Sequence, residues 1–555
     1  MKRALILLLA ITSATAAFAD DLDFSTLRYL VVYKDVRKKP LDTVAIETLQ
    51  KISGKRAFVD PESGRKMEPM DVLLSMWLET RDWSQTPVVL LTYQPLKAQL
   101  GLPVDQSLFS YKQLATPKLK EILTRVQQKE NRDQDLTRDE REAKVLGQRL
   151  SALSDVVGPD TLEVVPPPSA KDKWAAVTQV ADHYGAQKQA EVQKAFQAMA
   201  TGYVQRDPET FAVASRDLSK LLRALNPALY PSFDNLRREV RYNSFHLFRK
   251  AIALYAFAFI WMLATWRARN PGFYWAGVAA FAGGLAVHAY AFYLRIMISG
   301  RPPVTNMYES VVWVSCIAAL FALTLELAYR QRYYIVGVAP LSIVLLILAD
   351  QFPAVLDSSI GPLTPVLRDN FWLSVHVPTI TAGYAAFFVT LGVGHIALGY
   401  YICAPQAKAT IARLETLVYR AMQIGVLLIA AGTILGGIWA HYAWGRFWGW
   451  DPKEVWALIT LLCYLIPLHG RVAGWLSDFA LSVASVVCFL PVLMAWYGVN
   501  FVLGKGLHSY GFGVGGYWYA LAFVAVELAF VGVAAWRRRR VNLTAESGIV
   551  GRVTA

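Results

Sequence analysis

The residue types best suited to chemistry lie close together in residues 439–456. Five of the chain's 17 tryptophans fall within this one stretch. They are Trp439, Trp444, Trp448, Trp450 and Trp456. An aromatic belt at a membrane surface explains an occasional tryptophan at a helix end, but not five together. Broad, rigid indoles beside a few charged groups, here Arg446, Asp451 and Lys453, suit a large, flat and mostly apolar ligand. Asp451 before Pro452 is also typical of a helix N-cap.

Two histidines could supply metal ligands to such a compound. His376 begins the predicted membrane helix 374–402, and His508 lies in the last predicted outer loop. A lone histidine at a membrane surface is commonly a polar side chain satisfied by water or a carbonyl group. Two on the same predicted face as five tryptophans instead favour haem, whose iron takes imidazole from opposite sides of the ring. Its two carboxylates could pair with Arg446 and Lys453.

Two further histidines lie within predicted membrane helices. His469 closes the helix 455–469 near the predicted inner face, and His288 lies inside the helix 274–295. Ionisable residues at membrane depth are costly, so they indicate function by default. Helix counting places His288 nearer the outer face than His469. The second intramembrane ligand could therefore be His288 or come from a partner subunit.

The tryptophan-rich stretch resembles the WWD signature of haem-handling proteins in cytochrome c maturation. Three flanking segments match the same family. They are Gly300–Glu309 (GRPPVTNMYE), Trp372–His376 (WLSVH), and the pair Gly498–Phe501 (GVNF) and Gly506–Tyr510 (GLHSY). Over most of residues 270–520 the chain is similar to the integral-membrane haem-handling subunit of system II cytochrome c synthetases.

The resemblance implies a function and a set of ligands. His376 and His508 would be the outer ligands of haem b, and His469 would belong to a first, intramembrane haem site. Haem would be presented for thioether attachment to an exported apocytochrome c carrying Cys-x-x-Cys-His, together with a second synthetase subunit. His441 stands where the family usually has asparagine, so no family role carries over to that position; it could still bind a metal.

Two other classes of protein would share some of these features. A membrane electron carrier of the cytochrome b type would keep bis-histidine haem permanently, and it would need two histidine pairs at matched depth. A haem or small-molecule transporter would use discontinuous helices and a site near the bilayer midplane. Neither class requires a tryptophan platform at the outer face.

The composition indicates a protein that is partly membrane-embedded. Hydrophobic residues make up 55% of the chain. Residues 20–245 hold 33 Lys/Arg against 31 Asp/Glu, whereas residues 246–555 hold 21 against 11. The basic excess therefore belongs to the apolar half, where it indicates topology and contact with lipid rather than nucleic-acid binding. The sequence contains no Cys-x-x-Cys-His, so the chain is not itself a c-type cytochrome.

The predicted architecture is a polytopic α-helical membrane protein with an α+β extracytoplasmic domain. Residues 1–19 read as a signal peptide. Residues 20–245 form the exported domain, 246–540 the polytopic haem-handling domain, and 541–555 a cytoplasmic tail. Nine membrane helices are predicted, at about 248–266, 274–295, 309–329, 333–349, 374–402, 418–438, 455–469, 479–500 and 517–536. Lys and Arg concentrate in alternate connections, which places the tryptophan-rich loop on the outer side of the cytoplasmic membrane.

The exported domain has no recognisable catalytic constellation, and its expected role is docking or assembly. Strand-like segments occupy 27–33 and 88–93, and an amphipathic helix lies near 43–52. Residues 117–153 are highly charged with helical spacing, which predicts a solvated helix or hairpin. The proline-rich run 164–169 reads as a stiff linker.

Overall fold

The computed structural model describes residues 22–553, apart from residues 133, 354, 364, 505 and 509–516; the side chains of 365, 366 and 542–553 are also outside the description. The predicted signal peptide lies outside the described residues. The chain packs as two compact units. Of the described residues, the first comprises 22–91, 105–116 and 149–240, and the second comprises 92–104, 117–148 and 241–553. The sequence assigns residues 20–245 to one exported domain, whereas packing divides these residues between the two units.

The first unit combines short antiparallel strand pairs with helices, which confirms the predicted α+β class; the predicted strand 27–33 begins only at Val31, after a 3-10 turn. Its strands pair as β1 (Val31–Lys34) with β2 (Arg37–Pro40), β3 (Phe58–Val59) with β4 (Lys66–Met67), and β5 (Val89–Leu90) with β6 (Leu108–Phe109). Its helices are α2 (Leu41–Ser53), α3 (Pro69–Trp77), α5 (Tyr111–Leu114), α8 (Ala181–Val204), α9 (Pro208–Leu225) and most of α10 (Phe233–Phe245). Short 3-10 turns add η1 (Leu27–Tyr29), η2 (Val177–Gln179) and η3 (Pro227–Leu229). Arg37 donates two hydrogen bonds of 2.8 Å to Glu239, which ties β2 to α10.

The proline-rich run 164–169 is not a linker, so that prediction is wrong. Val164, Val165, Pro166 and Pro167 are buried, and Val165 forms a β-bridge with Ala175. The Pro166 carbonyl accepts a hydrogen bond of 2.9 Å from the Tyr184 hydroxyl. A proline has no N–H to leave unsatisfied, and its carbonyl remains a good acceptor. A proline-rich run can therefore pack inside one unit as readily as it can link two units.

The second unit contains the predicted charged hairpin and the membrane helices. The helices α4 (Gln94–Leu100), α6 (Pro117–Asn131) and α7 (Arg138–Ser154) come first, and α7 continues into the first unit from residue 149. The hairpin of α6 and α7 is therefore confirmed. Asp139 on α7 accepts hydrogen bonds of 2.7 Å from Tyr93 and 2.6 Å from Gln99, which fasten α7 beside α4.

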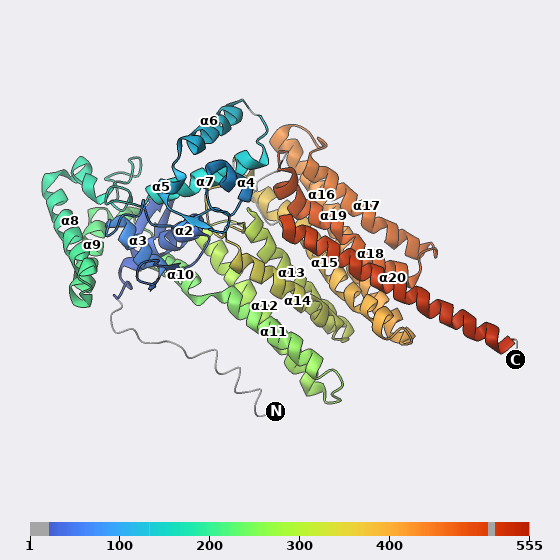
Figure 1. The fold of residues 1–555 in the computed structure, drawn as a ribbon. Coiled ribbons are helices and arrows are strands. Elements are labelled where there is room, and N and C mark those ends of the chain that lie inside the picture. Colours follow the sequence, from blue (N-terminus) through green and yellow to red (C-terminus); the bar gives the residue numbers. More distant parts are fainter. Residues whose placement is uncertain are drawn as a thin grey trace. The chain divides into compact units, whose positions relative to one another are not determined.

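Nine helical spans in the described part of the chain are long and apolar enough to cross a membrane, which confirms the predicted number. They are α11 (Leu247–Ala264), α12 (Pro271–Ser299), α13 (Met307–Tyr329), α14 (Tyr333–Gln351), α15 (Asn370–Cys403), α16 (Lys408–Trp444), α17 (Pro452–Val472), the composite span Asp478–Leu503, and α20 (Tyr517–Val553), whose apolar part ends at Val541. The short η4 (Pro365–Arg368) precedes α15. In Figure 1 these helices run alongside one another as a bundle.

Two spans differ from their predicted form. α16 continues through Trp439 to Trp444, so residues 439–456 are a helix end, a short loop and a helix start rather than one loop. Hydropathy falls at residue 438, but aromatic residues continue the helix until Gly445, which takes a left-handed conformation with φ of 69°. The eighth span is built from α18 (Asp478–Val487), α19 (Phe489–Leu493) and the π-helical segment η5 (Met494–Leu503).

Candidate functional site: a tryptophan-lined cavity with two histidines

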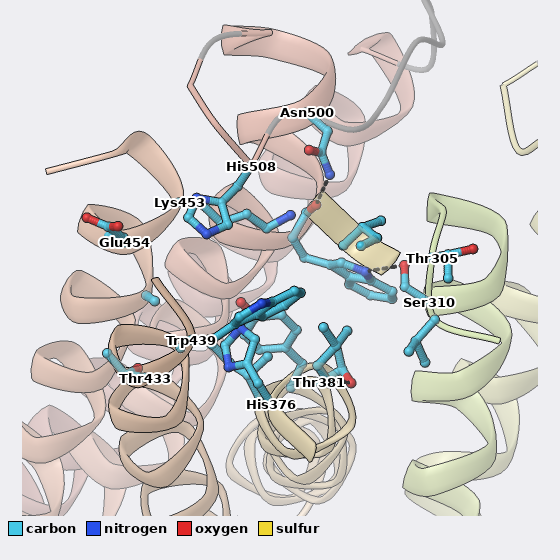
Figure 2. A pocket seen from close by; sticks show the side chains of 18 of the residues that line it. Thr305, Ser310, His376, Thr381, Thr433, Trp439, Lys453, Glu454, Asn500 and His508 are labelled. Carbon is cyan, nitrogen blue, oxygen red and sulfur yellow. Dashed lines mark hydrogen bonds between the residues drawn. The ribbon is translucent and has the colours of Figure 1, made fainter. Parts of the chain in front are cut away.

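A cavity lies among one end of α13, α15, α16, α17 and η5 in the second unit (Figure 2). It encloses about 1090 Å³ of empty space, including the part open to solvent. Both predicted outer histidines line it, with Trp439, Trp448 and Lys453. The structure thus brings together residues that are up to 132 positions apart in the sequence, from His376 to His508.

His376 is held in one orientation by the neighbouring helix α16. Its Nδ1 lies 2.9 Å from the carbonyl oxygen of Gly432. A carbonyl oxygen only accepts hydrogen bonds, so Nδ1 carries the proton and Nε2 keeps its lone pair for a metal. Gly436 gives the ring its space, because a Cβ there would lie 2.6 Å from Cε1 of His376. Trp439 packs edge-on against the imidazole, with ring centroids 5.6 Å apart.

His508 is held by a carboxylate. Its Nδ1 lies 2.9 Å from Oδ2 of Asp451, the residue that caps α17. Metal-binding histidines commonly hold a carboxylate in this way, which fixes the ring and raises its basicity. The backbone amides of Leu507 and Lys453 donate to the same carboxylate at 2.6 and 3.1 Å. Burial raises the pKa of the Asp451 carboxyl, but the hydrogen bonds from His508 and the two amides together lower it by more. The pKa of Asp451 therefore lies below its ordinary value.

The five tryptophans have different surroundings. Trp439 and Trp448 line the cavity, and Trp444 packs edge-on against His508 with ring centroids 5.0 Å apart. Trp450 is 71% exposed and lies perpendicular to Trp448, with ring centroids 5.8 Å apart. Trp456 is half-buried and packs against the core of the helix bundle. Two of these five indoles therefore form part of the cavity wall, and the other three do not line it.

The two predicted cations also differ. Lys453 lines the cavity, and among the described residues no carboxylate pairs with its ammonium group. Arg446 pairs with Glu454 at 3.2 Å, and its guanidinium lies 5.6 Å from the centre of the Trp444 ring. Glu454 also accepts hydrogen bonds from the Gly449 and Asp451 amides, which shapes the loop between α16 and α17. Lys453 is thus the better placed partner for an anionic group in the cavity. His441 is exposed and does not line the cavity.

Several lining residues were not singled out from the sequence. Tyr384, Trp496 and Ser310 contribute to the wall, and the Trp496 indole donates a hydrogen bond of 2.9 Å to Ser310. Asn306 and Asn500 lie within the flanking segments quoted above, and that membership was the one available signal. Nothing in the type or spacing of Tyr384 distinguishes it from an ordinary aromatic residue of a membrane helix.

The two predicted intramembrane histidines lie apart from this cavity. His469 is exposed near the end of α17, and its Nδ1 lies 2.9 Å from the Leu465 carbonyl oxygen. His288 on α12 is fully buried, with the Tyr255 hydroxyl 3.3 Å from Nδ1 and no described partner for Nε2. Its ring contacts come from Tyr255, Phe248 and Phe292, on α11 and α12. No described contact joins His288 to α17.

The fold and the cavity define a polytopic membrane protein with a histidine- and tryptophan-lined site near one end of its helices. The profile of the cytochrome C assembly protein family matches residues 304–508. The chain is 31% identical to the cytochrome c biogenesis protein CcsA of Chlorella vulgaris over 281 residues, which cover 44% of this chain and 88% of that protein. It is 32% identical to CcsA of a Synechococcus strain, over 39% of this chain and 81% of that protein. The chain belongs to this cytochrome c assembly family.

Protein NrfI of Wolinella succinogenes is similar over more of the chain. Identity is 28% over 510 residues, which cover 87% of this chain. The alignment therefore extends well beyond residues 304–508 and into the region before the membrane helices. The chain spans about half of NrfI, since the alignment covers 54% of that protein.

Proposed function

We propose that the chain is the haem-handling membrane subunit of a cytochrome c synthetase, and that haem b is its substrate. The observation that carries the proposal is the convergence of His376 and His508 on one cavity whose wall contains Trp439 and Trp448. The names of the CcsA relatives, which state cytochrome c biogenesis, support the same function.

The donor set of the cavity fits haem. His376 has its Nδ1 bonded to an oxygen acceptor, which leaves Nε2 for iron, and the carboxylate of Asp451 orients His508. Imidazole pairs are common axial ligands of haem iron. Indole faces suit the porphyrin plane, and the ammonium of Lys453 suits a propionate group. Most of the remaining lining is apolar, as expected for a ligand with a large hydrocarbon surface.

The chain's contribution to the reaction is orientation. When bound, haem supplies vinyl groups, across each of which a cysteine S–H of the apocytochrome adds to form a thioether without a leaving group. His376 and His508 would hold the iron, and the tryptophans would limit rotation of the ring. Effective molarity from such positioning can replace acid–base power in an addition of this kind.

The same proposal assigns topology and partners. Residues 20–245, the loop between α16 and α17, and the cavity would lie outside the cytoplasmic membrane, with Arg537–Arg540 inside. Haem would reach the cavity from a first site at His469, and a second synthetase subunit and an apocytochrome c with Cys-x-x-Cys-His would be the partners. Cysteines placed at Gly445 and Arg539 test the topology: an impermeant thiol reagent should label the first in intact cells and the second only after lysis.

The test of function uses His376→Ala and His508→Ala variants with a co-expressed c-type cytochrome. Each variant leaves space for a free imidazole beside an otherwise intact cavity. Covalent cytochrome should therefore fall in each single variant and recover in part when imidazole is added. If the protein were a permanent electron carrier, the amount of covalent cytochrome would not depend on these residues. Normal maturation by both variants without imidazole would contradict the proposal.

A further inference from the structure

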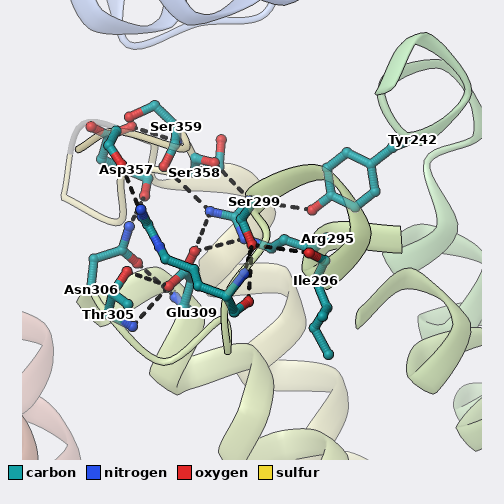
Figure 3. A network of polar contacts seen from close by, with 12 residues as sticks. Tyr242, Arg295, Ile296, Ser299, Thr305, Asn306, Glu309, Asp357, Ser358 and Ser359 are labelled. Carbon is teal, nitrogen blue, oxygen red and sulfur yellow. Dashed lines mark hydrogen bonds and ion pairs between the residues drawn. The ribbon is translucent and has the colours of Figure 1, made fainter. Parts of the chain in front are cut away.

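A buried ion pair joins α12 to α13 beside the cavity (Figure 3). Arg295 and Glu309 are each 1% exposed. Nε and Nη2 of Arg295 both contact Oε1 of Glu309, at 2.8 and 2.7 Å. The remaining guanidinium hydrogens reach the carbonyls of Ser358 and Ser359, at 2.9 and 3.3 Å, and the Tyr242 hydroxyl at 3.4 Å. All five N–H donors of the arginine therefore have acceptors.

The carboxylate of Glu309 is equally well satisfied. Its Oε2 accepts hydrogen bonds from the amide and the hydroxyl of Thr305, at 2.8 and 2.7 Å. The Glu309 amide in turn donates to the side chain of Asn306 at 2.9 Å, and Asn306 donates to the Asp357 carbonyl at 3.4 Å. A buried ion pair adds little net stability over apolar packing, so its value lies in the backbone it fixes. Here it fixes residues 304–306 against residues 357–359.

The fixed segment is a wall of the cavity. Val304, Thr305 and Asn306 line it. Val304 also belongs to a small apolar cluster with Leu367, Leu373 and Trp439. Trp439 is the residue whose indole packs against the imidazole of His376. The ion pair thus holds Thr305, the neighbour of Val304 in the sequence, and Val304 shares an apolar cluster with the tryptophan that packs against His376.

We propose that Arg295 and Glu309 are positioning residues for His376, acting through the wall segment 304–306 and Trp439. The inference rests on the proposed function, because it assigns the role of iron ligand to His376. It accounts for Glu309, which the sequence marks as part of a family segment without giving it a role. It also adds Arg295, which lies outside all of the quoted segments.

The first experiment is a double-mutant cycle of Glu309→Gln with His376→Gly. In the unmodified chain, Glu309→Gln should lower cytochrome maturation about 10-fold, within the range of about 10–100-fold known for residues that orient metal ligands. The absorption spectrum of copurified haem should shift toward incomplete axial ligation. In the His376→Gly background filled with imidazole, the free ligand no longer depends on Trp439 for its position. The added cost of Glu309→Gln should then fall below about 2-fold, because the two changes share one cause.

The control is Glu326→Gln, at the other end of the same helix α13. Glu326 is also buried, and it accepts a hydrogen bond of 3.0 Å from the Tyr274 hydroxyl. The loss of a buried carboxyl group is therefore matched, but the cavity is not involved. Glu326→Gln should leave the haem spectrum unchanged. An equal spectral shift in this control would show that Glu309 acts only through general stability, which would overturn the proposal.

A second readout needs no haem. In the haem-free full-length protein, Glu309→Gln should accelerate amide hydrogen exchange in residues 304–307 and 439–441, whereas Glu326→Gln should not. If Glu309→Gln fails to accumulate, Thr305→Val serves instead, since it removes one hydrogen bond to Glu309. If Glu309→Gln lowers maturation by the same factor in the imidazole-filled background as in the unmodified chain, the positioning role is overturned but the proposed function is not. Failure of imidazole to rescue His376→Gly would instead count against the proposed function.

Discussion

The carboxylate of Asp451 lies 2.9 Å from Nδ1 of His508 while it also caps the helix α17. One side chain therefore joins the start of a membrane helix to a histidine 57 positions later in the sequence. Gly506 makes this approach feasible: its φ is +98°, and a Cβ at that position would collide with the Asp451 carboxylate. The local geometry of the loop thus serves the orientation of His508.

Asp451→Asn should separate these two roles. Asparagine is as good an N-cap as aspartate, so α17 should remain intact. The imidazole would lose its charged acceptor, and maturation should fall about 10-fold or more, as for other oriented metal-binding histidines. The matched control is Ser477→Ala, which removes the cap of α18 without touching a cavity histidine. Wild-type maturation by Asp451→Asn, measured by covalent haem staining, would show that Asp451 is only a cap.

Gly436→Ala should displace His376 without removing it. The added methyl group would lie 2.6 Å from Cε1 of the imidazole, well inside van der Waals contact. The ring must rotate away, so the hydrogen bond to the Gly432 carbonyl should weaken and copurified haem should lose its bis-histidine spectrum. Gly399→Ala is the control, because that glycine lies on α15 and a Cβ there meets nothing within 4 Å. Identical spectra for the two variants would contradict the assigned geometry.

Lys453 should determine how strongly the cavity binds the carboxylates of haem. Lys453→Gln is one bond shorter than lysine and keeps the capacity to donate hydrogen bonds, but it removes the charge. Binding of haem should weaken about 10-fold, which corresponds to about 1.4 kcal/mol. Binding of haem dimethyl ester, which has no free carboxylates, should change little. Arg446→Gln provides the comparison, since Arg446 is already paired with Glu454. Equal losses for haem and its ester would show that Lys453 acts through packing.

The sequence predicted the membrane part of the fold well, because a run of about 20 apolar residues has few alternatives to a spanning helix. It also predicted that histidines and tryptophans would converge on one face. It placed the end of α16 six residues too early, since hydropathy does not register an aromatic helix extending beyond the apolar core. The break of the eighth span into α18, α19 and η5 likewise left no mark in the apolar pattern.

The contacts that orient the site could not be predicted from the sequence. The acceptor for His376 is a backbone carbonyl at Gly432, and every residue has a backbone carbonyl. The contact exists only because α15 and α16 pack at this point. Arg295 and Glu309 are separated by a turn whose course decides whether they meet at all. Residue type can therefore indicate a ligand, whereas tertiary packing determines what holds it.

The inner site gives the last prediction. His469 is exposed near the end of α17, and its Nδ1 is bonded to the Leu465 carbonyl, so Nε2 remains available to iron. His469→Ala should lower the haem that copurifies with the protein several-fold, while haem added to the purified protein should still bind at His376 and His508. His441→Ala is the control, because His441 is equally an exposed histidine on a membrane helix and, like His469, does not line the cavity. Pyridine haemochrome assays of the purified proteins measure the content. Unchanged haem in His469→Ala would show that this histidine only ends a helix, and haem would then have to reach the cavity by another route.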